Sequence, residues 1–313
     1  MRCTHRSGTG TINDVVRRSR NRALPAVAAV AGRFGRDLAT CFAQIERTVR
    51  RARARGAELV VFPEASLGGY RFENRLPVRR PPVAPPPAID PDGEEIQRLV
   101  ALAGPTVLCV GYTEAAPEGP YSSAVCLNGD GILGRHRKVH VPPEERADFV
   151  PGEGFGAFDT PLGRMGMLIC YDKVFPEAAR ELAVDGAGII ASLAAWPVCR
   201  VRPAARVRCD REVRQFNLLD QTRALENQVV WVSANQSGRL GRLRFPAQAK
   251  VVDPDGRVLC TTGARPGIAL ARLDARGAVT RARRELSHLA HRRPYAYGSR
   301  AALPGDASAP AVA

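Results

Sequence analysis

Three residues with complementary chemistry each follow a short segment that reads as a strand. Glu64 comes after VVFP, Lys138 after LGRHR and Cys170 after MGMLI. In parallel α/β sheets, residues just beyond the carboxyl ends of the strands face the ligand crevice. The spacing therefore predicts that a carboxylate, an ammonium group and a thiol meet at one edge of a sheet.

These three groups can together carry out nucleophilic catalysis. A free thiol has a pKa of about 8.5 and needs a base or a nearby cation to react at neutral pH. A carboxylate can take the thiol proton and return it to a leaving amine, and an ammonium group can stabilise an oxyanion. This chemistry requires no metal and no cofactor. On spacing alone, the alternative that Cys170 is a small buried hydrophobic residue stays open.

Longer blocks around these residues resemble the carbon–nitrogen hydrolase (nitrilase) superfamily over about residues 23–297. The three signature blocks are VVFPEASLGGY (60–70), GRHRKVHVP (134–142) and GRMGMLICYDKVFPEAAR (163–180). Supporting blocks are FVPGEGFGAFDTPLG (149–163), RALENQVVWVSANQSG (223–238), AKVVDPDG (249–256) and HRRPYAYG (291–298). The G-x-S-x-G, P-loop and G-x-G-x-x-G motifs of other enzyme classes are absent from the sequence.

The resemblance implies a role for each of the three residues. Glu64 is the general base, Lys138 stabilises the oxyanion and Cys170 is the nucleophile that forms a thioester. The family also has a second active-site glutamate, typically six residues before the Pro-Gly of an F-x-P-G turn. Counting back from Pro151 indicates Glu145, with Glu144 as the fallback. The simpler alternative is that this acidic pair is solvated surface.

Members of this superfamily cleave amides, nitriles or N-carbamoyl groups, and some transfer acyl groups. Tyr171 and Asp172 follow the nucleophile where nitrilases usually have Trp-Glu, which favours hydrolysis of a primary amide with release of ammonia. Hydrolysis of N-carbamoyl compounds or nitriles, and acyl transfer by the same residues, remain alternatives. Val174 stands where amidases for dicarboxylic monoamides often have Arg, which argues against an acidic substrate. Lys173 or the arginine-rich stretch 200–214 could still supply a charge from elsewhere.

A pocket for such a substrate is expected to be mostly apolar with few polar groups. The candidate substrate-binding residues are Tyr70, Phe149, Tyr171, Val174, Trp196 and Pro197. Trp196 is equally suited to a place in the core. The simplest interpretation of the arginine-rich stretch is a solvated basic loop.

The elements that must position these residues alternate between strands and helices, which predicts an α/β fold. The predicted helices cover residues 37–55, 94–103, 175–185 and 216–227. The predicted strands cover 23–30, 58–62, 106–110, 124–127, 132–137, 165–169, 189–192, 229–234, 249–252 and 258–260. Seven prolines between residues 77 and 91 indicate an irregular loop. The superfamily resemblance implies a four-layer αββα sandwich whose subunits commonly pair into homodimers through their helix layers.

Composition restricts the remaining classes of protein. The 313 residues, 45% of them hydrophobic, suit one domain over 23–298 flanked by disordered tails, 1–22 and 299–313. No apolar run approaches the ~20 residues of a membrane span. Eight cysteines without a C-x-x-C pair, and no visible secretory signal, favour reduced thiols in a cytoplasmic protein. The net charge of +15 raises the alternative of a nucleic-acid-binding scaffold, but no RNP, zinc-finger or helix-turn-helix signature accompanies it.

Overall fold

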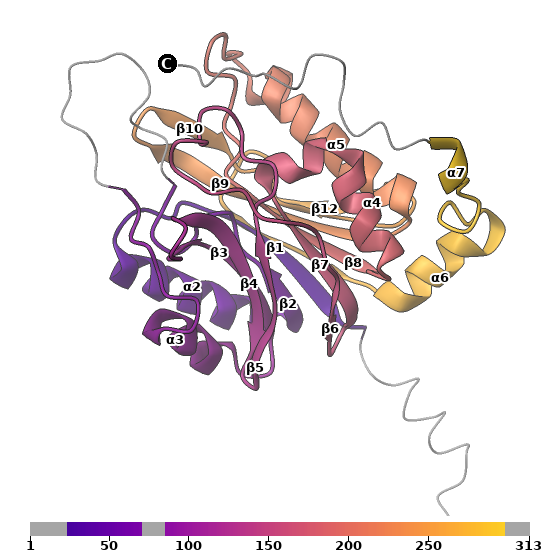
Figure 1. The fold of residues 1–313 in the computed structure, drawn as a ribbon, viewed down its shortest axis with the longest axis horizontal. Coiled ribbons are helices and arrows are strands. Elements are labelled where there is room, and N and C mark those ends of the chain that lie inside the picture. The colour runs from indigo at the N-terminus through magenta and orange to yellow at the C-terminus, as the bar shows by residue number, and fades with distance from the viewer. Residues whose placement is uncertain (1–23, 71–84, 298–313) are drawn as a thin grey trace, which may run out of the picture.

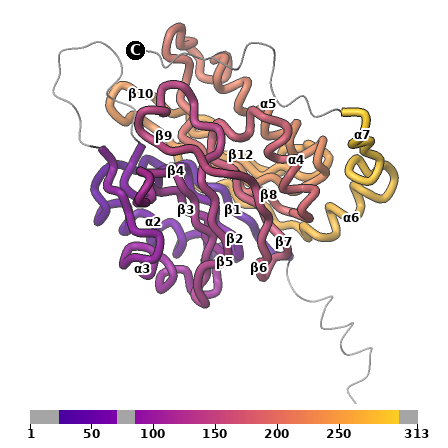
Figure 2. The backbone as a smooth tube through the Cα atoms, viewed as in Figure 1, coloured from indigo at the N-terminus to yellow at the C-terminus, as the bar shows by residue number. Residues whose placement is uncertain are grey.

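The computed structural model describes residues 24–70 and 85–297 of the chain. Both predicted disordered tails, and the part of the proline-rich loop up to residue 84, lie outside these residues. The described end of that loop returns to the sheet, where Ile89 forms a bridge with Glu114. Figures 1 and 2 show the arrangement of the elements, with the earlier helices on one side and the later ones on the other.

The strands form one mixed sheet that has two halves. The order is β5-β4-β3-β2-β1-β9-β8-β7-β6, and β1 joins the halves by pairing in parallel with β9. The first half consists of β1 (Ala26–Gly32), β2 (Ala57–Val61), β3 (Val107–Glu114), β4 (Tyr121–Asn128) and β5 (Gly131–Arg137). The second half consists of β6 (Phe158–Thr160), β7 (Gly163–Ile169), β8 (Ile189–Ala194) and β9 (Val230–Leu240).

Four further strands extend this sheet at its margins. They are β10 (Leu243–Pro246), β11 (Lys250–Val252), β12 (Val258–Thr261) and β13 (Gly267–Arg272). β10 and β11 pair with β9, β12 pairs with β11, and β13 runs antiparallel to β1.

Helices cover the outer face of each half. The first half carries α2 (Leu38–Arg53) and α3 (Glu94–Ala103), and the second carries α4 (Pro176–Val184) and α5 (Arg211–Asn227). Two short 3-10 turns, η1 (Cys170–Val174) and η2 (Val207–Cys209), lie between strands and helices of the second half. Near the carboxyl end follow α6 (Ala275–Glu285) and α7 (Pro294–Tyr297).

The alternation of side chains along the strands explains the layers. Val27 and Ala29 of β1 pack in the same core as Met165 and Met167 of β7, so the two sheet halves face one another. The intervening residue of β1, Ala28, points outward into a second core with α2 and α3. A third core joins the outer face of β7 and β8 to α4 and α5. The order helix, sheet, sheet, helix confirms the four-layer sandwich.

Most predicted elements occur within a few residues of their expected bounds, and the exceptions have local causes. α5 begins at Arg211 rather than at 216 because the Asp210 side chain caps it by accepting from the Glu212 N–H. α6 was not predicted, since Val279 is its one buried residue and it has no apolar stripe. β13 was not predicted either, although it covers an edge of β1.

Strand direction brings several carboxyl ends to one edge of the sandwich. β2 and β3 are parallel, and two successive antiparallel steps make β5 run the same way. β7, β8 and β9 are parallel to one another and, through β9, to β1. The residues after β2, β5, β7 and β8 therefore project from the same edge. Among the described residues, no helix is long and apolar enough to cross a membrane.

Candidate active site

Glu64 lies three residues beyond the end of β2 and is 2% exposed. Its Oε2 accepts a hydrogen bond from the Ala195 N–H at 2.9 Å, just after β8, and its carbonyl accepts from Gln236 Nε2 at 3.0 Å. Gly111 of β3 lets this turn approach the sheet, since a Cβ there would stand 2.9 Å from the Glu64 Cα. Ala65 has a φ of +52°, so the backbone beside Glu64 is strained.

Lys138 follows the last residue of β5 and connects two carboxylates. Its Nζ donates to Glu64 Oε1 at 2.9 Å and to Glu145 Oε2 at 2.7 Å, and the lysine is 1% exposed. Burial by itself would lower the pKa of this ammonium group, but Glu145 and Glu64 outweigh burial and hold the pKa well above its ordinary value. Lys138 is therefore a fixed cation at neutral pH.

Glu145 completes the charged cluster from a turn that follows β5. The turn closes with the Glu145 N–H donating to the Pro142 carbonyl at 2.8 Å. The Tyr70 hydroxyl donates to the second carboxylate oxygen of Glu145. Burial raises the pKa of Glu145, opposed by Lys138 and supported by Glu64. Burial, with the charges of Glu145 and Glu64, also holds the pKa of Tyr70 well above its usual range, so Tyr70 stays a phenol donor.

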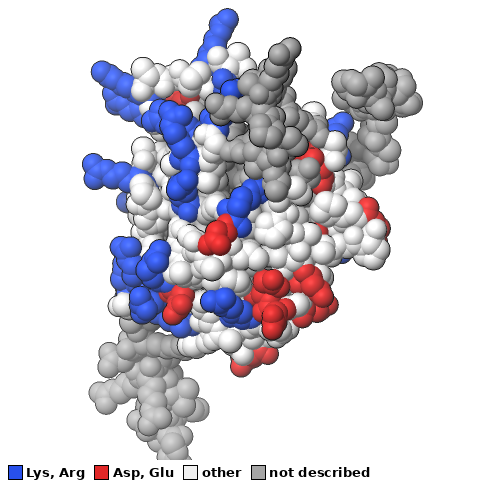
Figure 3. All heavy atoms as spheres, turned by 90° about the vertical axis from the view of Figure 1, so that its left-hand side faces the viewer, with Lys and Arg blue, Asp and Glu red and all other residues white. Residues whose placement is uncertain are grey.

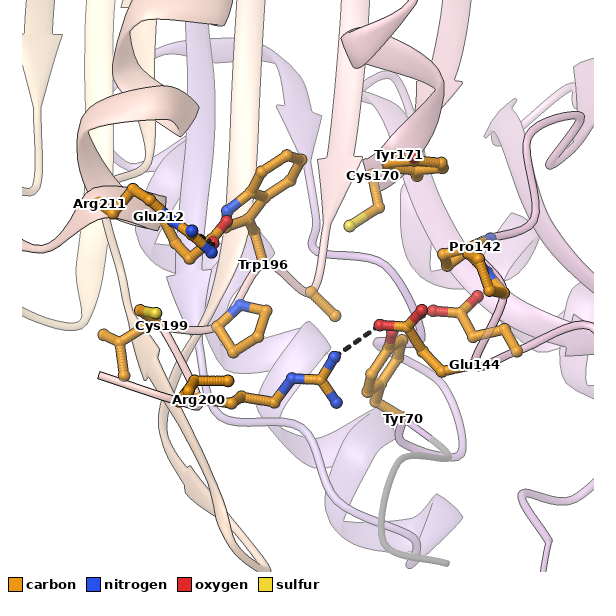
Figure 4. A pocket seen from close by; sticks show the side chains of 16 residues that line it. Tyr70, Pro142, Glu144, Cys170, Tyr171, Trp196, Cys199, Arg200, Arg211 and Glu212 are labelled. Carbon is orange, nitrogen blue, oxygen red and sulfur yellow. Dashed lines mark hydrogen bonds and ion pairs between the residues drawn. The ribbon is translucent and has the colours of Figure 1, made fainter. Parts of the chain in front are cut away.

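Cys170 stands directly after β7 and begins η1. Its φ of +47° is a strained conformation for a non-glycine residue, as expected where a side chain is turned into a site. Burial raises the pKa of the thiol well above its ordinary value, and the nearby Glu64 carboxylate raises it further, while Lys138 opposes both. In Figure 4 the sulfur points into a cavity between Tyr171 on one side and Trp196 on the other.

The cavity above Cys170 has a volume of about 340 Å³. Its lining residues are Tyr70, Pro142, Pro143, Glu144, Glu145, Cys170, Tyr171, Ala195, Trp196, Pro197, Val198, Cys199, Arg200, Val201, Arg211 and Glu212. Among these lining residues Glu145, Cys170 and Trp196 are buried, whereas Glu144, Arg200, Arg211 and Glu212 are more exposed. A small molecule with one apolar portion and one polar end fits such a space.

A buried aspartate holds the turn that carries Cys170. Asp172 accepts from the Ile169 N–H at 3.1 Å and from the His140 N–H at 2.8 Å, and both His136 Nε2 and His140 Nδ1 lie 3.0 Å from its carboxylate. Burial alone would raise the pKa of Asp172, but these contacts outweigh it and lower the pKa far below the ordinary value. Asp172 therefore ties η1 to the segment that carries Lys138.

A second buried cluster lies next to the turn that carries Cys170. Asp220 of α5 accepts from Lys173 Nζ at 2.8 Å, from Lys250 Nζ at 2.6 Å and from Trp231 Nε1 at 2.9 Å. The Lys173 Nζ also lies 3.2 Å from the centre of the Phe216 ring. Burial lowers the pKa of Lys173 to about 8, against the opposing effect of Asp220. This cluster fastens η1 to α5.

The structure brings some of the sequence-predicted residues together and separates others. Glu145 rather than Glu144 reaches Lys138, and Glu144 lies at the rim, where it pairs with Arg200. Val174, the last residue of η1, packs against the core and does not line the cavity. Phe149 also lies outside the lining of this cavity.

Several residues that shape or line the site had no role predicted from the sequence. Asn235 and Gln236 of β9 fix the turns after β8 and β2, with Asn235 Oδ1 accepting from the Trp196 N–H at 2.8 Å. They belong to the block at 223–238, which indicated a family but no role for these amides. Arg200 and Arg211, interpreted from the sequence as solvated, both line the cavity. No local pattern distinguishes them from the other arginines of that loop.

Comparison with known proteins agrees with this geometry. The chain is 34% identical over 221 residues to a protein named nitrilase from Pyrococcus abyssi, covering 70% of this chain and 77% of that one. It is 30% identical over 268 residues to an (R)-stereoselective amidase of a Pseudomonas species, covering 83% and 88%.

The fold has solved counterparts as well. The crystal structure of an amidase from a Nesterenkonia species superimposes with a TM-score of 0.69 at 24% identity, over 88% of this chain and 95% of that chain. A family model described as carbon-nitrogen hydrolase matches residues 26–283. This match spans both sheet halves and includes every charged residue described around Cys170. This chain therefore belongs to the carbon-nitrogen hydrolase family and is a hydrolase of that class.

Proposed function

We propose that this protein hydrolyses primary amides through a thioester on Cys170, with release of ammonia. The observation that carries the proposal is the cluster beside the thiol. Lys138 is held between the carboxylates of Glu64 and Glu145, and Cys170 lines the same cavity as Glu145. One cation, one base and one nucleophile are the groups that acyl transfer from an amide needs.

In the first half of the reaction, Glu64 takes the proton of the Cys170 thiol as the sulfur attacks the amide carbon. The raised pKa of the thiol means that this transfer accompanies the attack, because the free thiolate is scarce. The oxyanion that forms is stabilised by the ammonium group of Lys138. Glu64 then gives its proton to the amide nitrogen, the C–N bond breaks, and ammonia leaves a thioester behind.

In the second half, a water molecule replaces ammonia. Glu64 removes a proton from this water as its oxygen attacks the thioester carbon, and Lys138 again stabilises the oxyanion. The C–S bond breaks, the thiol recovers its proton from Glu64, and the carboxylic acid leaves. Glu145 and Tyr70 hold Lys138 in place throughout by the hydrogen bonds described above.

The same groups permit related reactions. Nitriles and N-carbamoyl compounds would be attacked by the same thiol, and an amine in place of water would give acyl transfer. The Tyr171–Asp172 pair and the amidase among the relatives support amides as the main substrates. The relative named nitrilase makes a nitrile the second candidate. Product analysis with an added amine acceptor separates hydrolysis from acyl transfer.

The decisive experiment measures ammonia release from matched nitriles, primary amides and N-carbamoyl compounds by the wild type and by Cys170→Ala. We expect primary amides to have the highest kcat/KM and the variant to fall to background, because alanine cannot form the acyl-enzyme. An acyl adduct on Cys170 should be detectable by mass spectrometry after acid quenching.

The exposed thiol offers a control. Cys209→Ala removes a surface cysteine outside the cavity lining and should leave turnover within about twofold of the wild type, as surface substitutions usually do. Turnover by Cys170→Ala comparable to that of Cys209→Ala would refute the thioester mechanism. A clear preference of the wild type for nitriles would refute the assignment of substrate.

A further inference from the structure

The wall of the cavity opposite Glu145 is an arginine-rich loop between β8 and α5. Residues 199–214, which run from this loop into the first turn of α5, include the arginines 200, 202, 206, 208, 211 and 214, with Asp210 and Glu212 as the only acids. The loop lies at the top of Figure 1, beside the end of α5. Arg200 and Arg211 line the same cavity as Cys170.

A buried carboxylate fixes the shape of this loop. Asp210 accepts from the Cys199 N–H at 3.0 Å, next to Arg200, and from the Ala204 N–H at 3.1 Å. It also caps α5 through the Glu212 N–H at 3.0 Å. The backbone segment that carries Arg200 is therefore held at both ends.

Arg200 spans the mouth of the cavity. Its Nη2 lies 2.6 Å from Glu144 Oε1, so one ion pair connects the wall after β8 with the wall that carries Glu145 (Figure 4). The two side chains are 40% and 34% exposed. Ion pairs with this much solvent contribute little to stability, so a competing anion can replace Glu144 at small cost.

The charge of the mouth favours an anion over a cation. Among the described residues that line the cavity, Glu144 pairs with Arg200, Glu212 pairs with Arg211, and Glu145 is bound to Lys138. The exposed arginines 202, 206 and 208 add positive charge on the same loop. These arginines lie outside the cavity lining, so the excess of positive charge belongs to the surface around the mouth, where it raises the local concentration of anions. Val174, whose lack of charge argued against an acidic substrate in the sequence, lies outside the cavity lining and therefore does not affect the choice between anion and cation.

We propose that Arg200 is a specificity-determining residue that binds a carboxylate at the far end of the substrate. The substrate class is then the monoamide of a dicarboxylic acid, with the amide at Cys170 and the carboxylate at the guanidinium group. This inference rests on the proposed amide hydrolysis. An arginine can bind a carboxylate through two parallel N–H···O bonds, which a neutral amide cannot offer.

The test compares monoamides of four- to six-carbon dicarboxylic acids with neutral amides of the same chain length. The readout is the ratio of the two kcat/KM values. We expect the wild type to favour the carboxylated amide and Arg200→Gln to lower the ratio roughly tenfold, the loss typical of one charge-assisted contact. Arg202→Gln, on the same loop but outside the lining, should change the ratio less than twofold.

A second variant separates recognition of the anion from integrity of the mouth. Glu144→Gln breaks the same ion pair but leaves Arg200 in place, so the ratio should stay the same or rise. If Glu144→Gln and Arg200→Gln lower the ratio equally, the pair has a structural role and the proposal is wrong. A wild type that favours amides with a distal amine, and loses this preference in Glu144→Gln, would also overturn it.

Binding to the inactive enzyme distinguishes failure of this proposal from failure of the proposed function. The affinity of the carboxylated amide for Cys170→Ala is measured by calorimetry, with and without Arg200→Gln. We expect a loss of roughly tenfold in the double variant. If the wild type hydrolyses no amide, the proposed function fails, while the two affinities still decide the role of Arg200. Equal affinities of Cys170→Ala and of the double variant for the carboxylated amide would refute the role of Arg200 in binding the carboxylate.

Discussion

At the scale of single residues, Glu64 has two opposed effects on Cys170. In the proposed mechanism it is the base that accepts the thiol proton, yet as a nearby anion it raises the pKa of the free thiol. Lys138, in contact with Glu64, acts in the opposite sense. The resting enzyme therefore holds a thiol rather than a thiolate, and reactivity depends on a base placed to accept the proton.

These opposed effects give a prediction that a purely structural role of Glu64 would not. Glu64→Gln keeps the shape but removes the base and the negative charge. The kcat for amide hydrolysis should fall by at least ~10², the usual contribution of a general base. At the same time the pKa of the Cys170 thiol should fall, because the charge that opposes the thiolate is gone.

Two measurements check this pair of effects. Amide hydrolysis gives kcat, and the pH dependence of alkylation by iodoacetamide reports the thiol. In the wild type, alkylation should keep rising above pH 9, whereas in Glu64→Gln the rise should occur at lower pH. Lys138→Ala is the matched comparison: it should lose kcat as well but move the thiol pKa upward. A variant Glu64→Gln with a higher thiol pKa would contradict this account.

At the scale of elements, the site depends on how the turn η1 is attached. Asp172 connects η1 to the segment after β5, and Lys173 connects it to α5 through Asp220. Arg223 of α5 adds hydrogen bonds to the carbonyls of Lys173 at 2.9 Å and Val174 at 2.8 Å. The strained φ of Cys170 persists because neighbouring elements hold the turn from both sides.

Removal of the Asp172 charge should loosen this attachment. Asp172→Asn replaces charge-assisted hydrogen bonds by weaker ones, and we expect the free energy of unfolding at pH 7 to fall by about 2–3 kcal/mol. The pKa of Asp172 is lowered in the folded state, so its stabilisation is complete above the unfolded pKa of about 3.9. It is lost as pH falls below that value toward the folded pKa.

Chemical denaturation at pH 7 and below pH 4 measures this difference. The difference in the free energy of unfolding between the wild type and Asp172→Asn should be smaller below pH 4 than at pH 7. Asp159→Asn is the control, because Asp159 is 86% exposed and its ion pair with Arg164 spans 3.5 Å. That change should cost less than about 0.5 kcal/mol. If both variants were equally stable at pH 7, Asp172 would not have the structural role assigned here.

At the scale of the whole molecule, charge and apolar surface are distributed unevenly. In Figure 3, basic side chains dominate the upper and left parts of the face shown, and acidic side chains gather at its lower right. The outer helix layer of the second sheet half carries exposed apolar side chains, among them Leu218 at 65% exposure and Val184 at 50%. Such side chains on a helix layer favour association when they cluster.

We propose that two copies of the chain pair through the α4–α5 layer. Light scattering after gel filtration should then give twice the subunit mass of 33.7 kDa for the wild type. Leu218→Glu should shift the protein toward the monomer, because it places a charge in the apolar contact. Leu24→Glu, which alters an exposed leucine before β1, should leave the assembly unchanged. A monomeric wild type, or equal dissociation by both variants, would contradict this pairing.

The sequence by itself determined the order of most elements and predicted the candidate catalytic residues. Apolar segments of strand length ending at Glu64 and Cys170 are local patterns, and a parallel sheet places such ends at one edge whatever the details of packing. The alternation of strands and helices likewise predicted an α/β fold, while the resemblance of longer sequence blocks to the superfamily implied the four layers. Elements without a local signal were missed, as in α6, where Val279 is the one buried residue.

Only the tertiary structure decided which loop residues reach the cavity. Glu144 and Glu145 are neighbours in the sequence, and the turn from Pro142 directs one to Arg200 and the other to Lys138. The 3-10 turn after Cys170 carries Val174 away from the cavity, while Arg200 enters it by pairing with a residue 56 positions earlier in the chain. Contacts of this kind join segments distant in sequence, so their energies depend on packing that no local pattern of residues records.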